Sequence, residues 1–112
     1  MKDGFSILVA EDEMQIVGFI VFRMESGHGY IDNICVTKER QGRGIGKALV
    51  TRVEEITKSN EFGSIRTDTT ENAEGIPWKS YGFWTSLGYI DTGERLATPY
   101  DFKEIPFIKK LG

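Results

Sequence analysis

The sequence predicts a single mixed α/β domain over residues 1–112, with the element order β-β-β-α-β-α-β-β. Two patterns lead to this fold class. The first third of the chain consists of short β-branched and apolar runs separated by polar turns, which is typical of strands. From Ile45 onward the apolar residues recur with the spacing of one helix face. A chain of 112 residues can bury a core of its own and leaves no room for a second domain.

Three strands are expected before the first helix. Residues 5–11 and 15–24 are rich in β-branched and aromatic side chains, and the acidic turn Glu11-Asp12-Glu13 separates them. Such a pair of runs predicts an antiparallel hairpin. A second turn over residues 26–29, which contains two glycines, precedes a third strand over residues 30–37.

Two helices and three further strands complete the prediction. The first helix is expected to start at Ile45 and to end near Asn60. Its apolar stripe consists of residues one to four positions apart: Ile45, Ala48, Leu49, Val53 and Ile56. A short strand over residues 64–70 follows. Pro77 fits the first turn of a second helix that runs to Leu87, with Gly88 as its cap. Residues 89–96 and 102–111 are predicted as two final strands.

The composition favours a cytoplasmic protein without a metal, a membrane span or a nucleic-acid partner. The net charge is −3, and neither Lys nor Arg dominates a long segment. Cys35 is the only cysteine, which excludes an internal disulfide, and His28 is the only histidine, which argues against a zinc site. No apolar run approaches the roughly 20 residues that span a bilayer. The first residues lack the apolar core of a signal peptide.

The segment Arg40-Gln41-Gly42-Arg43-Gly44-Ile45-Gly46-Lys47, between the third strand and the first helix, predicts a pyrophosphate site. Its three glycines let backbone N–H groups approach an anion closely. The first turn of the helix adds unpaired N–H donors and the positive end of the helix dipole. Arg40, Arg43 and Lys47 add full positive charges. The alternative is a glycine-rich loop that only closes a tight turn.

Two other phosphate-binding motifs do not fit this segment. A P-loop requires a glycine five residues before its Gly-Lys pair and Ser or Thr after it, but Gln41 and Ala48 occupy these positions. The dinucleotide fingerprint G-x-G-x-x-G would need its third glycine where Lys47 or Leu49 stands.

The segment does resemble the acetyl-CoA loop of the GNAT N-acetyltransferases, written Q/R-x-x-G-x-G/A, through Gln41, Gly44 and Gly46. The strand over residues 30–36 resembles the fourth strand of that family, and Leu87-Gly88-Tyr89 resembles its Leu-Gly-Phe step. The resemblance covers residues 5–96. It implies a GNAT-like acyl-CoA N-acyltransferase fold. It also implies direct transfer of an acetyl group from acetyl-CoA to a primary amine of a small molecule or a protein.

The resemblance further implies which residues hold acetyl-CoA. The pantetheine arm is expected between the strands over residues 30–37 and 64–70, bonded by backbone groups near Ile34, Cys35 and Val36. The pyrophosphate is expected on the turn, at Gln41, Gly42, Arg43, Gly44, Ile45, Gly46 and Lys47. Asn72 resembles a family asparagine that contacts the cofactor, and a turn-forming role is its equally good alternative.

Two catalytic residues are implied as well. Asp32 occupies the position where many relatives carry the carboxylate that deprotonates the attacking ammonium; its alternative is a solvent-facing carboxylate. A backbone N–H near Val36 would stabilise the oxyanion. The tyrosine that usually protonates the departing thiolate is replaced by Trp84. Tyr81, three residues earlier and on nearly the same helix face, is the expected substitute.

Cys35 and the two tryptophans are expected to have structural roles. No histidine is placed to form a dyad with Cys35, and direct transfer is the rule of the family, so a buried core cysteine is expected. Trp78 and Trp84 are expected to be packed aromatic side chains, and the same role is the alternative for Tyr81.

The sequence departs from the family at its start. Family members normally carry a strand and two helices before the hairpin that begins here at Phe5, and these elements commonly wall the acceptor pocket. Without them a sheet edge and apolar surface would be uncovered, so a second copy is expected to cover it in a homodimer. Two alternatives to an enzyme stay open: a module that binds acyl-CoA without turnover, and a subunit that needs a partner to complete its site.

Overall fold

The structure of the protein, a computed structural model, describes residues 4–112. Its contacts group the chain into two compact units. One consists of the residues up to Ile65 with Leu111–Gly112, and the other of Arg66–Lys110. A single domain over residues 1–112 therefore stays a prediction. The mixture of strands and helices, and their order along the chain, confirm the predicted fold class.

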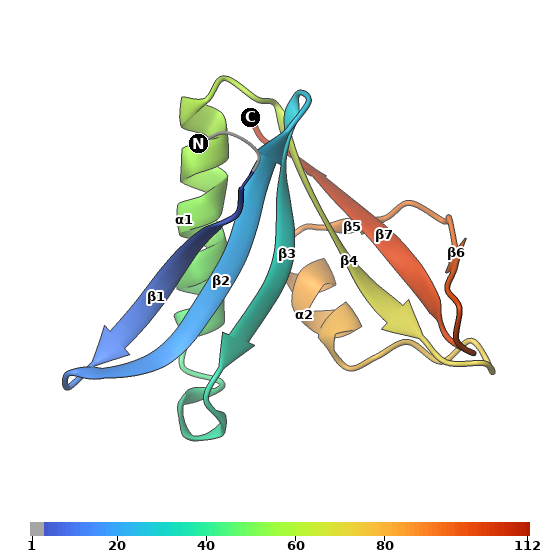
Figure 1. The fold of residues 1–112 in the computed structure, drawn as a ribbon, viewed down its shortest axis with the longest axis horizontal. Helices are drawn as coiled ribbons and strands as arrows, with labels where there is room; N and C mark the ends of the chain where they lie inside the picture. The colour runs from blue at the N-terminus through green and yellow to red at the C-terminus, as the bar shows by residue number, and fades with distance from the viewer. Residues whose placement is uncertain (1–3) are drawn as a thin grey trace. The chain divides into compact units, whose positions relative to one another are not determined.

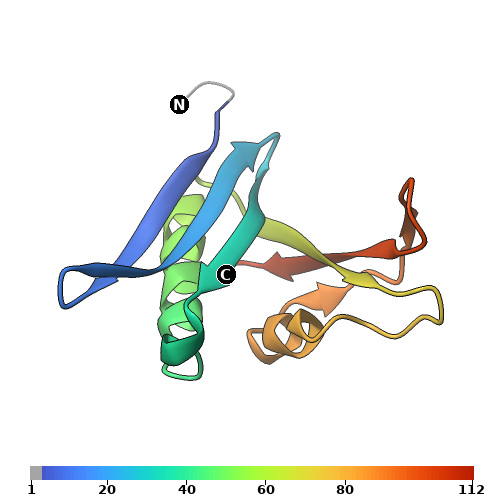
Figure 2. The same cartoon turned by 60° about the horizontal axis from the view of Figure 1, so that its bottom comes forward.

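The first unit is an antiparallel meander with a helix on one face (Figure 1). Its strands are β1 (Ser6–Asp12), β2 (Gln15–Glu25) and β3 (His28–Val36), with β2 between the other two. The helix α1 (Ile45–Ser59) packs against these strands, as Figure 2 shows from a second direction. The four elements expected in this part of the chain are confirmed, and their ends differ from the prediction by no more than two residues.

Alternation of side chains along the strands forms the core of this unit. The buried residues share one face of the strands and the helix side that meets it: Ile20, Phe22, Ile31, Leu49, Val50 and Val53. The intervening residues Phe19 and Val21 of β2 are only half-buried. The helix therefore covers one face of the meander, and the opposite face keeps apolar side chains in contact with solvent.

Two glycines let α1 come close to the strands. A Cβ on Gly29 of β3 would lie 2.4 Å from Oγ1 of Thr57, which is fully buried and donates its hydroxyl to the carbonyl of Val53 over 2.8 Å. A Cβ on Gly18 of β2 would lie 3.0 Å from the carbonyl oxygen of Cys35 and 3.5 Å from a methyl group of Ile45. The missing side chains thus place α1, and with it the helix N-terminus, near the strands.

A β-bulge in β3 changes which face its residues occupy. Ile31 pairs with Phe22 and Asn33 pairs with Val21, so Asp32 is the extra residue. Beyond the bulge Ile34 and Val36 are half-buried, whereas Cys35 is exposed. The expectation of a buried Cys35 is therefore wrong, because alternation places its side chain on the opposite face from Ile34 and Val36.

The second unit contains the residues of β4 (Ser64–Glu71) from Arg66 on, α2 (Ser80–Ser86), β5 (Ile90–Asp91), β6 (Leu96–Ala97) and β7 (Lys103–Lys110). In this unit β7 lies between β4 and β5, and β6 pairs with the start of β7. Its core gathers aromatic and aliphatic side chains from α2, from the connection between α2 and β5, and from β7: Trp84, Tyr89, Ile105 and Phe107.

The second half of the chain departs from the prediction in two elements. The helix expected from Pro77 begins only at Ser80, because Pro77 pairs in a bridge with Glu71 and the N–H of Trp78 donates to the carbonyl of Thr70 over 2.8 Å. The strand expected over residues 89–96 is limited to Ile90–Asp91, because Gly93 turns the chain with φ of +88°. Leu96–Ala97 is a separate short strand.

The helix cap and one of the two tryptophans agree with expectation. Gly88 ends α2 with φ of +90° and donates its N–H to the carbonyl of Thr85 over 3.1 Å. Trp84 is buried against Tyr89, whose ring centroid lies 5.1 Å away. Trp78 is 58% exposed, so the expectation that it is packed is wrong. Within residues 4–112, no helix has the length and apolar character needed to cross a membrane.

Replacing Gly29 by Ala is expected to lower the free energy of unfolding by about 1–3 kcal/mol, because the added Cβ would overlap Thr57 and push α1 away from β3. Urea unfolding followed by circular dichroism measures the change. Gly63→Ala is the matched control, since a Cβ on Gly63 meets no atom within 4 Å. Equal stability of the two variants would show that α1 can shift without a penalty.

Candidate functional site

The glycine-rich turn follows β3 directly. A short 3-10 helix, Lys38–Arg40, leads from the strand to Gln41. The side-chain amide of Gln41 donates to the carbonyl oxygen of Val36 over 3.0 Å. This bond ties the turn to the end of the strand, so Gln41 has a structural task inside the predicted motif.

Gly42 and Gly44 take left-handed backbone conformations, with φ of +80° and +83°. Side chains other than glycine rarely adopt this region. A Cβ built on either residue meets no atom within 4 Å, so the space beside the turn is open. The turn therefore needs glycine for its conformation, and it leaves room for a ligand next to its backbone.

The N-terminus of α1 offers unpaired donors to that space. The first bond of the helix runs from the N–H of Ala48 to the carbonyl of Gly44 over 2.9 Å, so the N–H groups of Ile45, Gly46 and Lys47 precede it. Gly44 has no side chain to cap them, and the first turn holds no acidic residue. Three N–H groups and the helix dipole thus favour an anion at this end.

The three basic residues of the turn differ in their contacts. Nε of Arg40 lies 3.1 Å from a carboxylate oxygen of Asp12, so Arg40 binds the end of β1. Arg43 and Lys47 form no ion pair with any of residues 4–112 within 4.0 Å. Two full positive charges therefore remain available to an anion at the turn.

The end of β3 points some of its backbone groups away from β2. The N–H of Thr37 donates to the carbonyl of Val17 in β2 over 2.8 Å. Because neighbouring residues of an antiparallel strand turn their backbone groups to opposite edges, the groups of Ile34 and Val36 point away from β2. Those of Cys35 point toward it. Of the three residues expected to bond the pantetheine arm, Ile34 and Val36 have the suitable direction.

Asp32 is held by an arginine. Its carboxylate lies 3.0 Å from Nη1 of Arg23, and its side chain is 21% exposed. Arg23 also pairs with Glu25 at 2.7 Å and lies over the ring of Tyr30, 4.7 Å from the centroid. The pKa of Arg23 is raised, because the desolvation that would lower it is outweighed by the bond to Glu25 and the charge of Asp32. Asp32 is thus an exposed residue of β3 whose carboxylate is paired with Arg23.

Asn72 shapes the turn after β4. Its side-chain oxygen accepts hydrogen bonds from the N–H groups of Glu74 at 3.0 Å and Ile76 at 2.9 Å. This arrangement supports the turn-forming role. Its side-chain nitrogen makes no hydrogen bond with the part of the chain that the structure describes.

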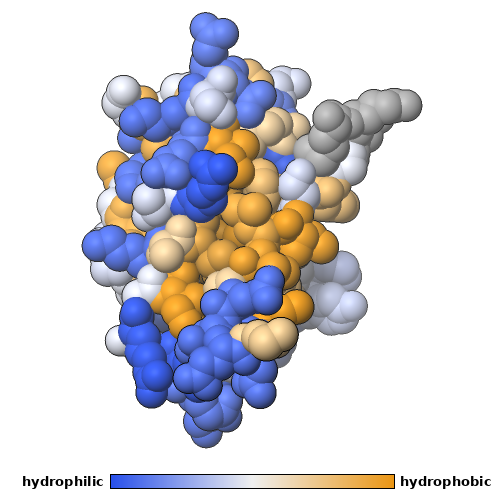
Figure 3. Space-filling view, turned by 90° about the vertical axis from the view of Figure 1, so that its left-hand side faces the viewer, coloured by the Kyte–Doolittle hydropathy of each residue, from blue (hydrophilic) through white to orange (hydrophobic). Residues whose placement is uncertain are grey.

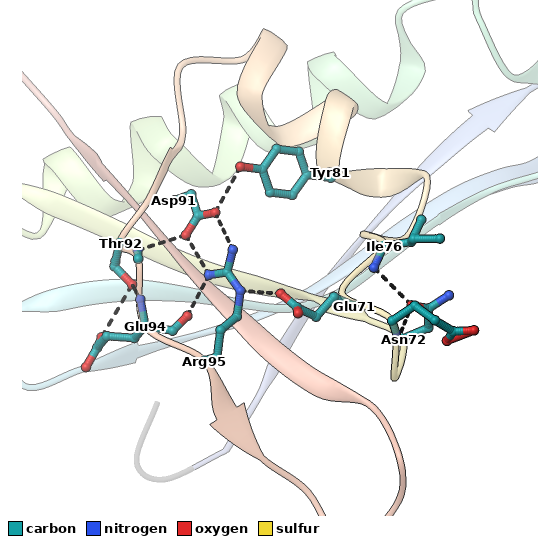
Figure 4. A network of polar contacts seen from close by, with 10 residues as sticks. Glu71, Asn72, Ile76, Tyr81, Asp91, Thr92, Glu94 and Arg95 are labelled. Atoms are coloured by element: carbon teal, nitrogen blue, oxygen red, sulfur yellow. Dashed lines mark hydrogen bonds and ion pairs between the residues drawn. The ribbon is translucent and has the colours of Figure 1, made fainter.

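Tyr81 belongs to a charged network in the second unit (Figure 4). Its hydroxyl donates to Oδ2 of Asp91 over 2.9 Å. Nη1 and Nη2 of Arg95 donate to the two oxygens of Asp91, each over 2.9 Å, and Nε of Arg95 donates to Glu71. The N–H of Gly93 adds a bond of 2.8 Å to Asp91. The guanidinium group of Arg95 therefore joins Glu71 to Asp91, and Tyr81 is connected to it through Asp91.

The network lowers the pKa of Asp91 and raises the pKa of Tyr81. The Arg95 guanidinium holds the pKa of Asp91 at about 2, against the opposing effect of desolvation, and the bonds from Gly93 and Tyr81 act in the same direction. The bond to Asp91 and desolvation raise the pKa of Tyr81 above its ordinary value of 10.0. At neutral pH the carboxylate is ionised and the tyrosine keeps its proton.

Sequence reasoning missed Asp91, Arg95 and Arg23. Asp91 and Arg95 are four residues apart, a spacing that would indicate a pair on a helix but carries no such meaning in the turn where they lie. Arg23 stands on β2 and reaches Asp32 across the pairing of β2 with β3, where Arg23 lies opposite Tyr30. Each pairing depends on tertiary structure, which a local pattern does not contain.

Comparison with known proteins identifies the family. The model of the acetyltransferase (GNAT) domain matches residues 3–91. This chain belongs to the GNAT acetyltransferase family. An uncharacterised N-acetyltransferase of Methanocaldococcus jannaschii is 44% identical over 46 residues, which are 41% of this chain and 30% of that protein. The match thus spans less than a third of the relative's length.

Solved structures support the GNAT fold. A candidate streptothricin acetyltransferase of Bacillus anthracis, in complex with acetyl coenzyme A, aligns with TM-score 0.84 and 23% identity over 99% of this chain and 65% of that one. An acetyltransferase of Bacillus cereus aligns with TM-score 0.76 and 24% identity, over 96% and 74% of the two chains. An aminoglycoside 6'-N-acetyltransferase complexed with coenzyme A aligns with TM-score 0.82 and 20% identity, over 97% and 74%. At these identities the likeness concerns the fold.

The Asp91 contacts predict a contribution to acid stability. Because the pKa of Asp91 falls from 3.8 to about 2 on folding, its carboxylate stabilises the folded chain above pH 3.8, and this stabilisation is lost as the pH falls through about 2. The difference in free energy of unfolding between wild type and Asp91→Asn should therefore narrow as the pH falls from neutral toward 2. Urea titrations at several pH values measure it. Asp101→Asn, at an exposed position, is the control, and a constant difference for Asp91→Asn would contradict the prediction.

Proposed function

We propose that this chain binds acetyl-CoA at the glycine-rich turn and transfers the acetyl group directly to a primary amine of a small molecule or a protein. The observation that carries the proposal is the uncapped N-terminus of α1 behind two left-handed glycines, with Arg43 and Lys47 unpaired among the described residues. A pyrophosphate has the charge and the acceptor oxygens that this arrangement favours. Membership of the acetyltransferase family and the acetyl coenzyme A in a similar fold support the same cofactor.

The pantetheine arm is proposed to follow β3. Backbone groups of Ile34 and Val36 point away from β2, and they would bond the arm as an added strand does. Cys35 lies between them, with its side chain exposed and its backbone turned to β2. Its proposed contact with the arm is therefore through its side chain. Asn72 is proposed to contact the cofactor through its side-chain nitrogen, since the oxygen is used in the turn.

The proposed reaction needs a base, an oxyanion donor and an acid. Asp32 takes a proton from the ammonium group of the acceptor, and the neutral amine attacks the thioester carbon. The N–H of Val36 stabilises the oxyanion of the tetrahedral intermediate. The C–S bond then breaks and its electron pair stays on sulfur. The thiolate of CoA takes the proton of Tyr81, and the nitrogen of the new amide releases its surplus proton to water. No metal takes part in this proposal.

A binding module without turnover is the second candidate function. Trp84 stands where the family carries its tyrosine, and it is buried in the core of the second unit. Tyr81 directs its proton to Asp91, and Asp32 is bound to Arg23. These contacts favour a chain that holds acyl-CoA without chemistry, or a subunit whose partner completes the site. Turnover separates both alternatives from the leading proposal.

A homodimer is proposed as well, with β1 at its interface. Phe5, Ile7 and Val9 are exposed by 57%, 61% and 48%, and Figure 3 shows apolar surface on the side of the molecule where β1 lies. Among the described residues β1 pairs only with β2, and its first five residues carry no charge that would discourage further pairing. A second copy offers the same strand, which can pair with this one about a two-fold axis.

A cytoplasmic location is proposed because the sequence has a single cysteine and therefore no internal disulfide, which secreted proteins often contain.

Calorimetric titration of the protein with acetyl-CoA tests the cofactor site. Wild type is expected to bind with a dissociation constant on the order of micromolar, and Gly44→Glu is expected to weaken binding by about 100-fold or more. The new side chain would strain a left-handed position and bring a negative charge to the pyrophosphate. Gly63→Glu adds the same charge at an open position and should bind as wild type does. Absence of wild-type binding would contradict the proposal.

Release of free thiol from acetyl-CoA in the presence of mixed primary amines completes this test. Release above the rate without amine, and its loss in Gly44→Glu, is expected for the enzyme. Binding without release supports the module or the incomplete subunit instead.

Val9→Lys is expected to turn the dimer into a monomer, because the substitution places a charge on the exposed face of β1. Light scattering coupled to size exclusion at micromolar concentration measures the mass. Thr51→Lys, which adds the same charge to an exposed position of α1, should leave the dimer intact. A monomeric wild type would contradict the proposed homodimer.

A further inference from the structure

Arg95 uses its whole guanidinium group to join two carboxylates of the second unit. Two parallel bonds of 2.9 Å reach Asp91, the third nitrogen donates to Glu71, and Nη1 also donates to the carbonyl of Glu94 over 2.7 Å. A bidentate pair of this kind fixes the plane of the carboxylate as well as its position. Asp91 therefore has a defined orientation although it lies at the end of a strand of two residues.

The orientation of Asp91 determines that of the Tyr81 hydroxyl. The ring of Tyr81 packs on Phe107 of β7, with centroids 5.2 Å apart and planes inclined by 59°. The hydroxyl then has one hydrogen-bond acceptor in the described chain, Oδ2 of Asp91 at 2.9 Å. Packing fixes the ring and the carboxylate fixes the proton, so neither is left to rotate freely.

Asp91 and Arg95 have opposite electrostatic effects on the hydroxyl. If Tyr81 gave up its proton, a phenolate would lie beside an ionised carboxylate, and the two negative charges would repel each other. The guanidinium that binds the same carboxylate attracts the phenolate and offsets part of that repulsion. The pKa of Tyr81 reflects both: the bond to Asp91 raises it, and the charge of Arg95 lowers it.

We propose that Asp91 and Arg95 are positioning residues for Tyr81, in which the carboxylate orients the hydroxyl and the guanidinium stabilises the phenolate left when the proton is given away. The inference rests on the proposed role of Tyr81 as the acid of the reaction. In that step the C–S bond breaks, its electron pair stays on sulfur, and the O–H proton of Tyr81 passes to the thiolate. Water then returns a proton to the phenolate.

Other charged groups near Tyr81 do not explain this behaviour. On its own element, Lys79 lies over the ring of Trp78, 5.6 Å from the centroid. From β7 the contact is the neutral ring of Phe107, and from β4 Glu71 reaches the network through Arg95. Asp91 and Arg95 are the charged groups that act on the hydroxyl itself.

The test is a titration of Tyr81 in single variants of the full chain, followed by NMR of the ring Cζ in tyrosine-labelled protein. The signal of Tyr81 is assigned by its loss in Tyr81→Phe. Asp91→Asn removes the negative charge, so the pKa of Tyr81 should fall toward 10.0. Arg95→Gln removes the positive charge, so the pKa should rise above that of wild type. Arg95→Lys keeps the charge and should lie between Arg95→Gln and wild type.

Opposite shifts are the decisive result. Both variants break the same network, so a network that only held the fold together would move the Tyr81 titration in one direction, toward the value of a solvated phenol. Shifts of the same sign would therefore overturn the proposal. Arg95→Lys keeps the proposal testable if Arg95→Gln does not fold. A Tyr81 pKa at or above that of wild type in a folded Lys variant supports the proposal, and a fall toward 10.0 contradicts it.

Kinetics distinguishes this inference from the proposed function. If the wild type releases thiol, Tyr81→Phe should lower kcat by about 100-fold or more with little change in KM for acetyl-CoA. The alkaline limb of the kcat profile should follow the two opposite shifts. A fully active Tyr81→Phe enzyme would overturn the role of the network while leaving acetyl transfer intact. A wild type without turnover would overturn the catalytic role, whatever the titration shows.

Discussion

The close approach of α1 to β3 at Gly29 is the constraint on which the first unit depends. Thr57 occupies the space that a side chain at Gly29 would need, so a residue larger than glycine would push the helix away from the strand. At the other end of the helix, Gly18 leaves room for Ile45. A helix held at both ends presents its first N–H groups at one place, beside the end of β3. The anion site is therefore a consequence of how tightly the core packs, because dipoles and donors act on a ligand only where they are fixed.

The glycine-rich turn could be predicted from the sequence because everything that defines it is contiguous. The left-handed conformations of Gly42 and Gly44 are a property of residue type, and the uncapped helix start follows from a glycine at the N-cap. The strand before it and the helix after it are strongly periodic, so their positions are also local information. The hydrogen bond from Gln41 to the carbonyl of Val36 could not be predicted from the pattern. This bond connects the turn to the end of the strand.

The features that could not be predicted from the sequence each depend on a contact or an irregularity that exists only in the folded chain. One extra residue in β3 places Asp32 outside the regular alternation and moves Cys35 to the exposed face, and nothing in a run of apolar and polar residues marks that bulge. Pro77, suitable for a helix start, pairs instead with Glu71. The network around Arg95 joins segments that are far apart along the chain, so its members look like ordinary surface charges until the chain is folded.

Cofactor binding and proton transfer, the two parts of the proposed chemistry, therefore depend on different kinds of groups. The cofactor turn uses backbone groups, which do not titrate and which only a change of conformation can remove. The groups proposed to move protons are side chains, and each lies next to an arginine: Asp32 beside Arg23, and Tyr81 beside Asp91 with its Arg95. A guanidinium keeps its charge at any pH at which the chain is folded, so it can hold the carboxylate beside it in place throughout that range. Cofactor binding should thus tolerate changes of pH, whereas any proton transfer depends on how firmly these two arginines hold their carboxylates.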